Sequence, residues 1–346
     1  MLKEIEIQNF RCFEQIKISG FERVNLIGGK NNAGKTALLE ALFLNVAPYI
    51  SSLEILRDIR RESSKALEAM PERAWNNLFY TPIKAHQIIV IFGKNENNNT
   101  EKVEIKLSID PDQTNINIES IINEKSIHST FLNVSAKGLG AGASGFTDKN
   151  YITALVSGVV PIIPSFIRIS GIELTEAYDR ARLNEKDSEV LKAFQVIDPA
   201  IESVESFYIG EPTLYLRRKG EKRLPLSLFG DAMNRVAEII LKLVNSEHKI
   251  LLIDEIENGI HYKSQREFWR MLFRLAVELD TQIFATTHSL EMLQAFADVG
   301  LELEQECSIA YFEMARKLKT NQIIGSRLDL ETLNYALEHQ EGVRGE

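Results

Sequence analysis

The sequence has 346 residues, of which 44% are apolar, enough to build one large domain or two small ones around a full core. Its formal net charge of −9 gives no general electrostatic footprint for nucleic acid. Its two cysteines, Cys12 and Cys307, provide neither a disulfide framework nor the spacing of a zinc site, so we expect a cytoplasmic protein. The first residues predict a strand rather than a signal peptide. Pro161 and Pro164 interrupt the longest apolar stretch, 151–169, which argues against a membrane span.

A glycine-rich loop lies between a predicted strand at 24–28 and a predicted helix at 36–43. Residues 29–36 have the sequence Gly-Lys-Asn-Asn-Ala-Gly-Lys-Thr, which matches the phosphate-binding pattern G-x-x-x-x-G-K-[ST]. Glycines allow several main-chain N–H groups to point at one anion, and the helix N-terminus adds partial positive charge. We therefore expect Lys35 to reach the β- and γ-phosphates of a nucleotide and Thr36 to hold Mg²⁺. The alternative, an ordinary Gly/Asn turn before a core helix, is disfavoured by the second motif described below. The expected nucleotide-binding residues are Gly29, Asn31, Asn32, Ala33, Gly34, Lys35, Thr36 and Ala37.

The segment 51–80 is charged and is predicted to be helical. Its clustered Arg57, Arg60 and Arg61 could contact a phosphate, but we expect them on a solvated helix face. The chain then has four strand-like runs with turn residues between them, which predict an antiparallel β layer. These runs are 86–92, 101–109, 114–122 and 125–133. The glycine-rich segment 135–146 lacks a Lys-Ser/Thr ending, so it predicts a mobile linker rather than a second phosphate loop.

Residues 173–205 are predicted to form a helical insertion with a break at Pro199. The insertion lacks sustained heptads, so it cannot form a long coiled coil. A hairpin with strands at 213–218 and 222–226 is predicted to follow. Its basic tip, 217–223, could bind nucleic acid or another trigger, but a solvated charged tip is the simpler interpretation.

Two small residues precede the predicted helix at 235–244. Ser227 and Gly230 could form a second anion-binding site at the start of this helix. A Ser or Asp before a helix is also a common N-cap, so this signal alone leaves both interpretations open.

The second motif, at 249–255, has the sequence Lys-Ile-Leu-Leu-Ile-Asp-Glu. Its continuous apolar run predicts a parallel strand covered on both faces, and ligands of open α/β sheets bind at the carboxyl ends of such strands. We expect Asp254 to coordinate Mg²⁺ directly or through water. We expect Glu255 to orient and deprotonate an attacking water as a general base. An exposed strand end with ordinary solvated acids is the alternative.

A further short apolar strand, capped by polar residues, is predicted within 281–289, and His288 lies at its end. An amphipathic helix at 264–279 separates this strand from Glu255, and such βαβ spacing would set His288 beside the phosphate site. We expect His288 to donate a hydrogen bond to the γ-phosphate rather than to serve only as a capping residue. The predicted tail has strands at 307–315 and 322–326 and a helix at 330–338.

The order of these motifs resembles that of the ABC-type ATPase heads of SMC-, RecF- and OLD-like proteins. The resemblance is closest to the OLD-like or AAA-type abortive-infection ATPases, and it covers residues 1–50 and roughly 198–290. The segments that carry it are 2–13 with its Asn-Phe-Arg turn, 31–36, 224–231 and 253–261. It implies an α/β fold: a P-loop NTPase of the ABC-ATPase-head type, with a mixed sheet core, an antiparallel β layer and a short helical insertion.

The resemblance also implies a homodimer or a higher oligomer that binds ATP and Mg²⁺. Two heads would face each other head to tail, with ATP between the phosphate loop of one and the Ser227 segment of the other. The implied site residues are Lys35, Glu255 and His288 for catalysis, Thr36 and Asp254 for the metal, and Ser227 and Gly230 for the second contact with the nucleotide.

Residues 257–261 would lie near the seam of such a dimer. The sequence departs from the family pattern at Ala232, where the family often has Gly. No convincing glutamine loop is found, because the context of Gln87 does not establish one. Three segments are expected along the chain: 1–134 as the N-terminal ATPase half with the antiparallel layer, 135–205 as a flexible loop and helical insertion, and 206–346 as the C-terminal ATPase half.

The predicted function is an ATP-hydrolysing dimeric switch that regulates a separately encoded effector, in the anti-phage setting that the resemblance implies. OLD nucleases carry a metal-dependent Toprim nuclease domain after the ATPase. Only 58 residues (289–346) follow His288, so we expect no built-in nuclease. One alternative is a RecF-like DNA-binding repair ATPase, against which the acidic net charge counts. Another is a non-catalytic scaffold that keeps ATP bound.

Overall fold

The computed structural model describes residues 1–62, 75–81, 86–110, 113–135, 138–144, 161–165, 170–246, 249–303 and 305–339. The chain forms two compact units, and each unit is built from segments that are distant in sequence. The first unit comprises Met1–Glu22, Gly29–Gly158 and Phe312–Arg327. The second unit comprises Arg23–Gly28, Val159–Tyr311 and Leu328–Glu346.

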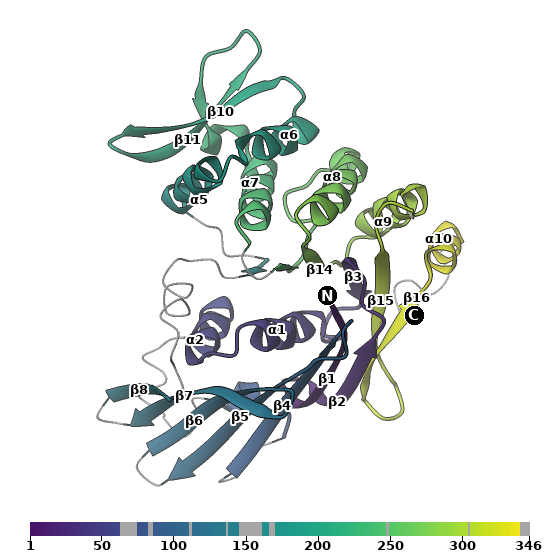
Figure 1. Ribbon diagram of the computed structural model, residues 1–346. Coiled ribbons are helices and arrows are strands. Elements are labelled where there is room, and N and C mark those ends of the chain that lie inside the picture. Colours follow the sequence, from purple (N-terminus) through teal and green to yellow (C-terminus); the bar gives the residue numbers. More distant parts are fainter. Residues whose placement is uncertain are drawn as a thin grey trace. The chain divides into compact units, whose positions relative to one another are not determined.

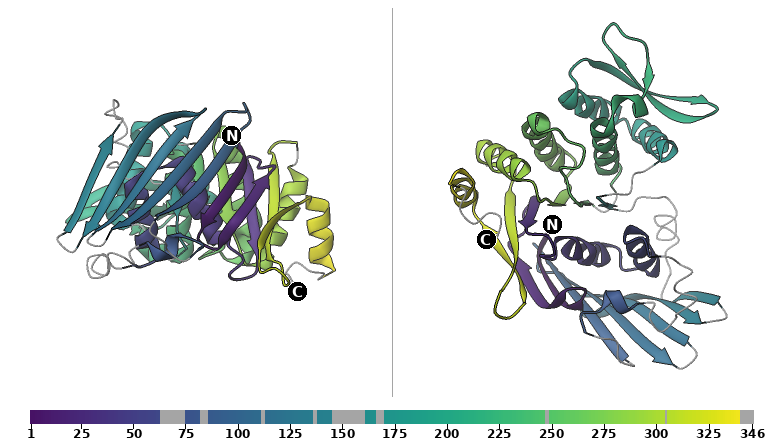
Figure 2. Two further views of the ribbon diagram at one scale, coloured as in Figure 1. Left: turned by 90° about the horizontal axis from the view of Figure 1, so that it is seen from below. Right: turned by 180° about the vertical axis from the view of Figure 1, so that it is seen from behind.

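The first unit contains an antiparallel sheet of seven strands in the order β2-β1-β4-β5-β6-β7-β8 (Figure 1). The left view of Figure 2 shows its strands side by side. Along β1, Ile5 and Ile7 are fully buried and Glu6 between them is partly exposed, as the two-residue period of a strand requires. The four strands predicted between residues 86 and 133 are confirmed as β4 to β7. The strands are β1 (Leu2–Phe10), β2 (Phe13–Ser19), β4 (His86–Asn95), β5 (Thr100–Asp110), β6 (Gln113–Ile122), β7 (Lys125–Ser135) and β8 (Gly138–Ser144).

Two helices, α1 (Lys35–Val46) and α2 (Ile50–Ile59), lie along one face of this sheet (Figure 1). In α1, nine of the twelve residues are buried, so the helix is enclosed on nearly all sides and its N-terminus is held in place. The helix predicted over 51–80 is confirmed only for α2. Residues 63–74 lie outside the described part, and a single 3₁₀ turn follows at Asn76–Leu78.

The prediction of a mobile linker at 135–146 is wrong for the central part of that segment. Residues 138–144 form β8, which pairs antiparallel with β7 from Ser129↔Ser144 to Ser135↔Gly138. The open edge of β7 offers main-chain donors and acceptors, and a ladder of main-chain hydrogen bonds does not need large side chains. The abundance of glycine in this segment therefore did not predict its conformation correctly.

Of the three clustered arginines, Arg60 and Arg61 are exposed as we expected, but Arg57 is not. Arg57 is buried, and its guanidinium lies 5.4 Å from the centre of the Trp75 ring. Arg60 binds Glu40 of α1 through Nε and Oε1 at 2.6 Å, and Arg11 binds the other oxygen of Glu40 at 2.9 Å. Glu40 is wholly inaccessible, and burial lowers the pKa of Arg11. This triad ties the helix that follows the phosphate loop to the β1–β2 turn and to α2.

Replacing Glu40 with Gln is expected to lower the free energy of unfolding by about 3–5 kcal/mol, because Arg11 would keep a buried charge without its counter-ion. The measurement is urea unfolding followed by circular dichroism. The matched control is Glu4→Gln, which removes a surface pair with Lys17 (2.8 Å) and should cost at most about 1 kcal/mol. Equal losses in the two variants would show that the triad contributes no more than a surface pair.

The second unit contains a parallel sheet in the order β3-β14-β13-β9. The residues of β14 are all buried, as are Leu251 to Ile253 of β13, which is why these strands were visible as continuous apolar runs. Strand β15 follows β3 in the sheet order and β16 follows β15, and both confirm the strands predicted in the tail. The first residues of β15 belong to the second unit, whereas its remainder and most of β16 belong to the first. The strands are β3 (Val24–Gly29), β9 (Ile162–Ile163), β13 (Ile250–Ile253), β14 (Gln282–Thr286), β15 (Ile309–Arg316) and β16 (Ile323–Leu328).

Helices α8 (Gln265–Glu278), α9 (Leu290–Glu302) and α10 (Leu330–Glu338) lie next to one another in this unit (Figure 1). Trp269 of α8 packs edge-on against Phe296 of α9 at 5.0 Å and donates a hydrogen bond to the carbonyl of Met292 at 3.2 Å. This contact holds together the two helices that flank β14 in the sequence. None of the helices in the described residues is long and apolar enough to cross a membrane.

The predicted helical insertion is confirmed as α5 (Gly171–Leu183) and α6 (Asp187–Ile197), but its last residues are not helical. Ile201–Ile209 form β10, which pairs with β11 (Glu211–Arg218). The predicted hairpin is confirmed in β11 and β12 (Leu224–Pro225), so β10 turns it into a three-stranded sheet. The run from Ile201 to Phe207 has β-branched and aromatic residues and lies beyond Pro199, where a helix had to end.

Candidate nucleotide-binding site

The phosphate loop has a backbone that requires glycine at both ends. Gly29, Asn32 and Gly34 have φ values of 128°, 62° and 92°. A Cβ on Gly29 would lie 2.1 Å from the carbonyl oxygen of Met314, and a Cβ on Gly34 would lie 2.9 Å from the ring of Phe13. Any larger residue at these two positions would therefore be strained and would clash. The observed loop conformation thus depends on glycine at both positions.

The start of α1 offers the features that an anion needs. Gly34 is its N-cap residue, no side chain caps the helix, and its first turn contains no acidic residue. The ammonium group of Lys35 lies across the loop and donates to the carbonyls of Gly29 at 2.6 Å and Lys30 at 3.0 Å. These groups fit the phosphates of a nucleotide.

Two residues beside the loop were not predicted. Arg316 at the end of β15 donates to the carbonyl of Asn32 at 3.4 Å. The sulfur of Cys12 would lie 3.2 Å from a Cβ on Gly34, and burial raises the pKa of this thiol, which favours its neutral form. Arg316 lies 284 positions from Asn32, so no local pattern could have pointed to it.

In the second unit, the expected carboxylates are joined to the end of β14 by hydrogen bonds. Asp254 is 7% exposed, and its Oδ1 accepts a hydrogen bond from the hydroxyl of Thr286 at 2.6 Å. The same hydroxyl accepts the main-chain N–H of Glu255 at 2.9 Å. Thr286 is in register with Ile27 of β3, the strand that leads into the phosphate loop along the chain. Thr286 therefore orients the acidic pair, although no motif had assigned it a role.

The side chains of Glu255 and His288 have different partners. The Oε2 atom of Glu255 accepts a hydrogen bond from the Asn258 amide at 2.9 Å. His288 Nδ1 lies 2.9 Å from Oε1 of Glu257 but 3.8 Å from Oε1 of Glu255. Asn258 and Glu257 belong to the segment that the resemblance assigned to a dimer seam, so their role within one chain was not predicted.

A buried arginine connects α7 (Asp231–Val244) to the acidic pair. Arg235 donates to the main-chain carbonyl of Asp254 at 2.9 Å and to that of Pro164 at 3.1 Å. It also pairs with Glu238 one turn further along at 3.3 Å. The helix that begins after the Ser227 segment is thus fixed to the backbone of the Asp-Glu strand.

The Ser227 segment is a short 3₁₀ turn, Leu226–Phe229, with an exposed serine. Gly230 is the N-cap residue of α7 and has a φ of 86°, and a Cβ added to it would have no described atom beyond its chain neighbours within 4 Å. The helix begins at Asp231, four residues earlier than the predicted start. The start of α7 has no side-chain cap and lies next to an exposed serine, which favours anion binding, but Asp231 places an acid in its first turn, which opposes it. The contact with a nucleotide stays a prediction.

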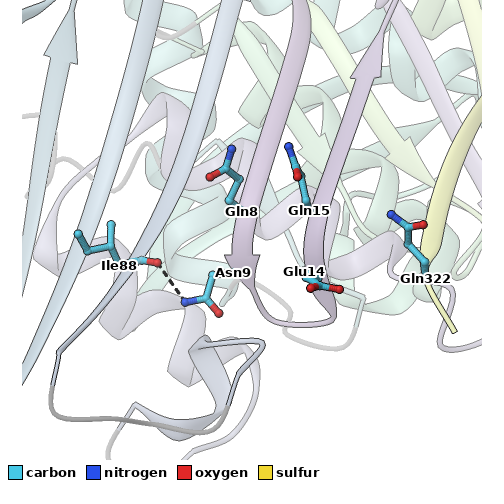
Figure 3. Close-up of a pocket in the computed structure, with 6 residues that line it drawn as sticks. All are labelled: Gln8, Asn9, Glu14, Gln15, Ile88 and Gln322. Carbon is cyan, nitrogen blue, oxygen red and sulfur yellow. Dashed lines mark hydrogen bonds between the residues drawn. The ribbon is translucent and has the colours of Figure 1, made fainter. Parts of the chain in front are cut away.

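A polar hollow in the first unit has a volume of about 460 Å³ (Figure 3). The amides of Gln8 and Gln15 both donate to Oε1 of Glu6, at 2.9 and 3.0 Å, and that of Asn9 donates to the carbonyl of Ile88 at 3.0 Å. Its lining is Gln8, Asn9, Glu14, Gln15, Ile88 and Gln322. None of these is an expected nucleotide-binding residue, and the amides of Gln8, Gln15 and Asn9 already form hydrogen bonds within the sheet.

The oxygen atoms available for a metal suit Mg²⁺. Within the described residues there is no group of three or more His, Cys, Asp or Glu that could hold a metal ion. Mg²⁺ bound with a nucleotide usually takes only one or two protein oxygens and keeps water and phosphate as its other ligands. The hydroxyl of Thr36 and the carboxylate of Asp254 are oxygen ligands of this kind.

The chain is similar to several known proteins. Residues 24–293 match the family model described as "AAA domain, putative AbiEii toxin, Type IV TA system". The chain is 25% identical to "ATP/GTP phosphatase" from Helicobacter pylori, and the alignment covers 100% of each chain.

Solved structures share the fold at low sequence identity. An SMC head bound to the C-winged helix domain of ScpA aligns with a TM-score of 0.52 and 10% identity, covering 96% of this chain and 98% of that one. An SMC head with an extended coiled coil, bound to the C-terminal domain of ScpA from Pyrococcus furiosus, aligns with a TM-score of 0.50 and 11% identity over 98% and 99%. The expected fold class, a P-loop NTPase of the ABC-ATPase-head type, is confirmed. The family match spans most of the chain, which therefore belongs to the AAA domain family described as putative AbiEii toxin, Type IV TA system.

Proposed function

We propose that this protein binds and hydrolyses ATP with Mg²⁺ and acts as a dimeric switch of the OLD-like type. The observation that carries the proposal is the hydrogen-bonded set Asp254–Thr286–Glu255 at the ends of parallel strands. Strand β3, a neighbour of β14 in that sheet, continues along the chain into the phosphate loop. The full-length similarity to a protein called "ATP/GTP phosphatase" supports the reaction and makes GTP the second nucleotide to test.

Each site residue has a role that follows from its chemistry. Lys35 and the N-terminus of α1 would bind the β- and γ-phosphates. Thr36 and Asp254 would hold Mg²⁺, which when bound neutralises charge on the phosphate oxygens. Glu255, half-exposed and held by Asn258 through one oxygen, can use the other to orient and deprotonate water. His288 would contact the γ-phosphate.

Chelation of the metal tests the requirement for Mg²⁺. Phosphate release from ATP is expected to fall to background when EDTA exceeds Mg²⁺ and to return when Mg²⁺ is added in excess, because no other group in the proposed site replaces the divalent charge. The measurement is a phosphate-release assay with wild-type protein. Undiminished turnover in EDTA would contradict the assignment of Thr36 and Asp254 as metal ligands.

The dimer is proposed from the Ser227 segment. An exposed serine next to the N-terminus of α7, which has no side-chain cap, could complete the site of a second copy by contacting its ATP. Head-to-tail pairing would give two such sites in a homodimer. The switch would then control a separately encoded effector, and anti-phage defence is the setting that the resemblance suggests.

A DNA-binding repair or SMC-like ATPase is the second candidate. The basic hairpin run that would carry DNA binding is partly neutralised, because its arginines are paired with acids: Arg217 with Glu202, Arg218 with Asp198 and Arg223 with Glu205. Salt-sensitive binding to duplex DNA together with stimulation of phosphate release would favour this candidate. Absence of both effects would favour the effector switch.

A further inference from the structure

The side chain of Glu257 is directed to His288. Its Oε1 atom accepts the main-chain N–H of His288 at 2.9 Å and faces the ring Nδ1 at 2.9 Å. The Glu257 side chain is 10% exposed, whereas that of His288 is 50% exposed. Its second oxygen, Oε2, is buried and has no hydrogen-bond partner within the described part of the chain. The carboxylate therefore serves His288 and no other described residue.

Glu255 is the other carboxylate near His288, but it lies too far from the ring to be its hydrogen-bond partner. The gap of 3.8 Å between Nδ1 and Glu255 Oε1 is too long for a hydrogen bond. Glu255 is held instead by Asn258, whose amide also donates to the carbonyl of Ser165 at 3.1 Å. Two carboxylates two positions apart thus have separate partners and separate tasks.

A local turn produces this separation. Glu255 has a φ of 49°, and the N–H of Ile256 donates to the carbonyl of Thr286 at 3.0 Å, so the turn is fixed to the end of β14. The Ile256 side chain is fully buried in the core. With Ile256 anchored, Glu257 is brought back towards the residues that follow β14.

The hydrogen bonds of Glu257 Oε1 determine which ring nitrogen of His288 carries the proton. An oxygen that already accepts a main-chain N–H acts as an acceptor, so the facing Nδ1 must be the donor. We infer that Glu257 is a positioning residue: it holds the ring of His288 in one orientation and keeps the ring proton on Nδ1, so that Nε2 faces the nucleotide as a hydrogen-bond acceptor. A ring held in this way can accept a hydrogen bond from the attacking water, in place of the donation to the γ-phosphate that the sequence led us to expect. A carboxylate behind an imidazole orients the ring in the same way in other catalytic sites. The inference rests on the proposed function for the identity of the ligand, but the state of the ring can be measured without nucleotide.

The first experiment is NMR of protein labelled with ¹⁵N-histidine, in which only six histidines contribute signals. The difference from His288→Ala identifies the signals of His288. In wild type we expect the proton on Nδ1. Glu257→Gln should keep that tautomer because its amide oxygen still accepts, and Glu257→Ala should lose it. A wild-type ring protonated on Nε2, or an unchanged ring in Glu257→Ala, would overturn the inference.

The second experiment is steady-state hydrolysis of ATP. Glu257→Ala should lower kcat by about 10–100-fold and change KM by less than about two-fold, whereas Glu257→Gln should keep most of the activity. In a His288→Ala background, Glu257→Ala should have no further effect, because the two residues act as one unit. The control is Glu267→Ala, which removes an exposed acid of α8 paired with Arg270.

The outcomes of these experiments separate the two proposals. Additive effects of Glu257→Ala and His288→Ala, or a Glu257→Gln variant as impaired as Glu257→Ala, would contradict a positioning role. Thermal melting of each variant verifies that it is folded. A wild-type protein without any hydrolysis would defeat the proposed function alone, since the ring tautomer is measured in the free protein.

Discussion

Replacing Glu255 with Gln is expected to lower phosphate release from ATP by about 100-fold or more. A general base typically contributes about 10²–10⁴-fold, and an amide cannot take a proton from water. Gln can still accept the hydrogen bond from Asn258, so the turn after β13 should keep its shape. Binding of ATP should persist, and the variant should accumulate as an ATP-bound dimer. Phosphate release and light scattering measure the two effects.

The control for this variant is Glu278→Gln, which alters an exposed acid that lies 3.6 Å from Arg274 at the end of α8. It should turn over ATP like wild type. Wild-type turnover in Glu255→Gln would remove the general-base assignment. If neither wild type nor Glu255→Gln releases phosphate, the protein either needs its effector for hydrolysis or retains ATP without hydrolysing it, as the scaffold alternative predicts.

Replacing Lys35 with Ala is expected to abolish ATP binding, with an affinity loss of about 100-fold or more, equivalent to roughly 2.7 kcal/mol. In the proposed site Lys35 would supply the positive charge closest to the phosphates, and charge-assisted hydrogen bonds to phosphate are among the strongest in proteins. In the free protein this ammonium lies on the carbonyls of Gly29 and Lys30, so it is already within the loop. Isothermal titration with ATP measures the affinity.

The control for the lysine variant is Lys17→Ala, which removes an exposed charge from β2. It should bind ATP with wild-type affinity, since screening leaves little influence for a surface charge outside the proposed site. Unchanged affinity in Lys35→Ala would refute the assignment of the loop.

The parts of the fold that were predicted correctly are those determined by local patterns. The parallel strands β13 and β14 appear as continuous apolar runs, and β4 to β7 have turn residues at their ends. Strands β8 and β10 were missed because pairing decided them. β8 adds to the free edge of β7, and β10 pairs with β11 along its whole length. Neither partner can be recognised from the segment itself.

In the candidate site, too, local features could be predicted and contacts between distant residues could not. The curl of the phosphate loop follows from Gly29 and Gly34, which lie within the motif. The hydrogen bonds that orient the acidic residues cross from one strand end to the next, as between Thr286 and Asp254. Such contacts between distant positions have no period or spacing in the sequence. The roles of the site residues, like the three segments 1–134, 135–205 and 206–346, stay predictions.

The central claim is that the phosphate loop and the Asp254–Glu255 pair act on one nucleotide. The direct measurement is a crystal structure with Mg²⁺ and a non-hydrolysable ATP analogue. We predict that the Lys35 ammonium contacts the β- and γ-phosphates while the Asp254 carboxylate binds the same Mg²⁺ directly or through one water. A nucleotide bound at Lys35 with Asp254 tens of ångströms away would contradict the account.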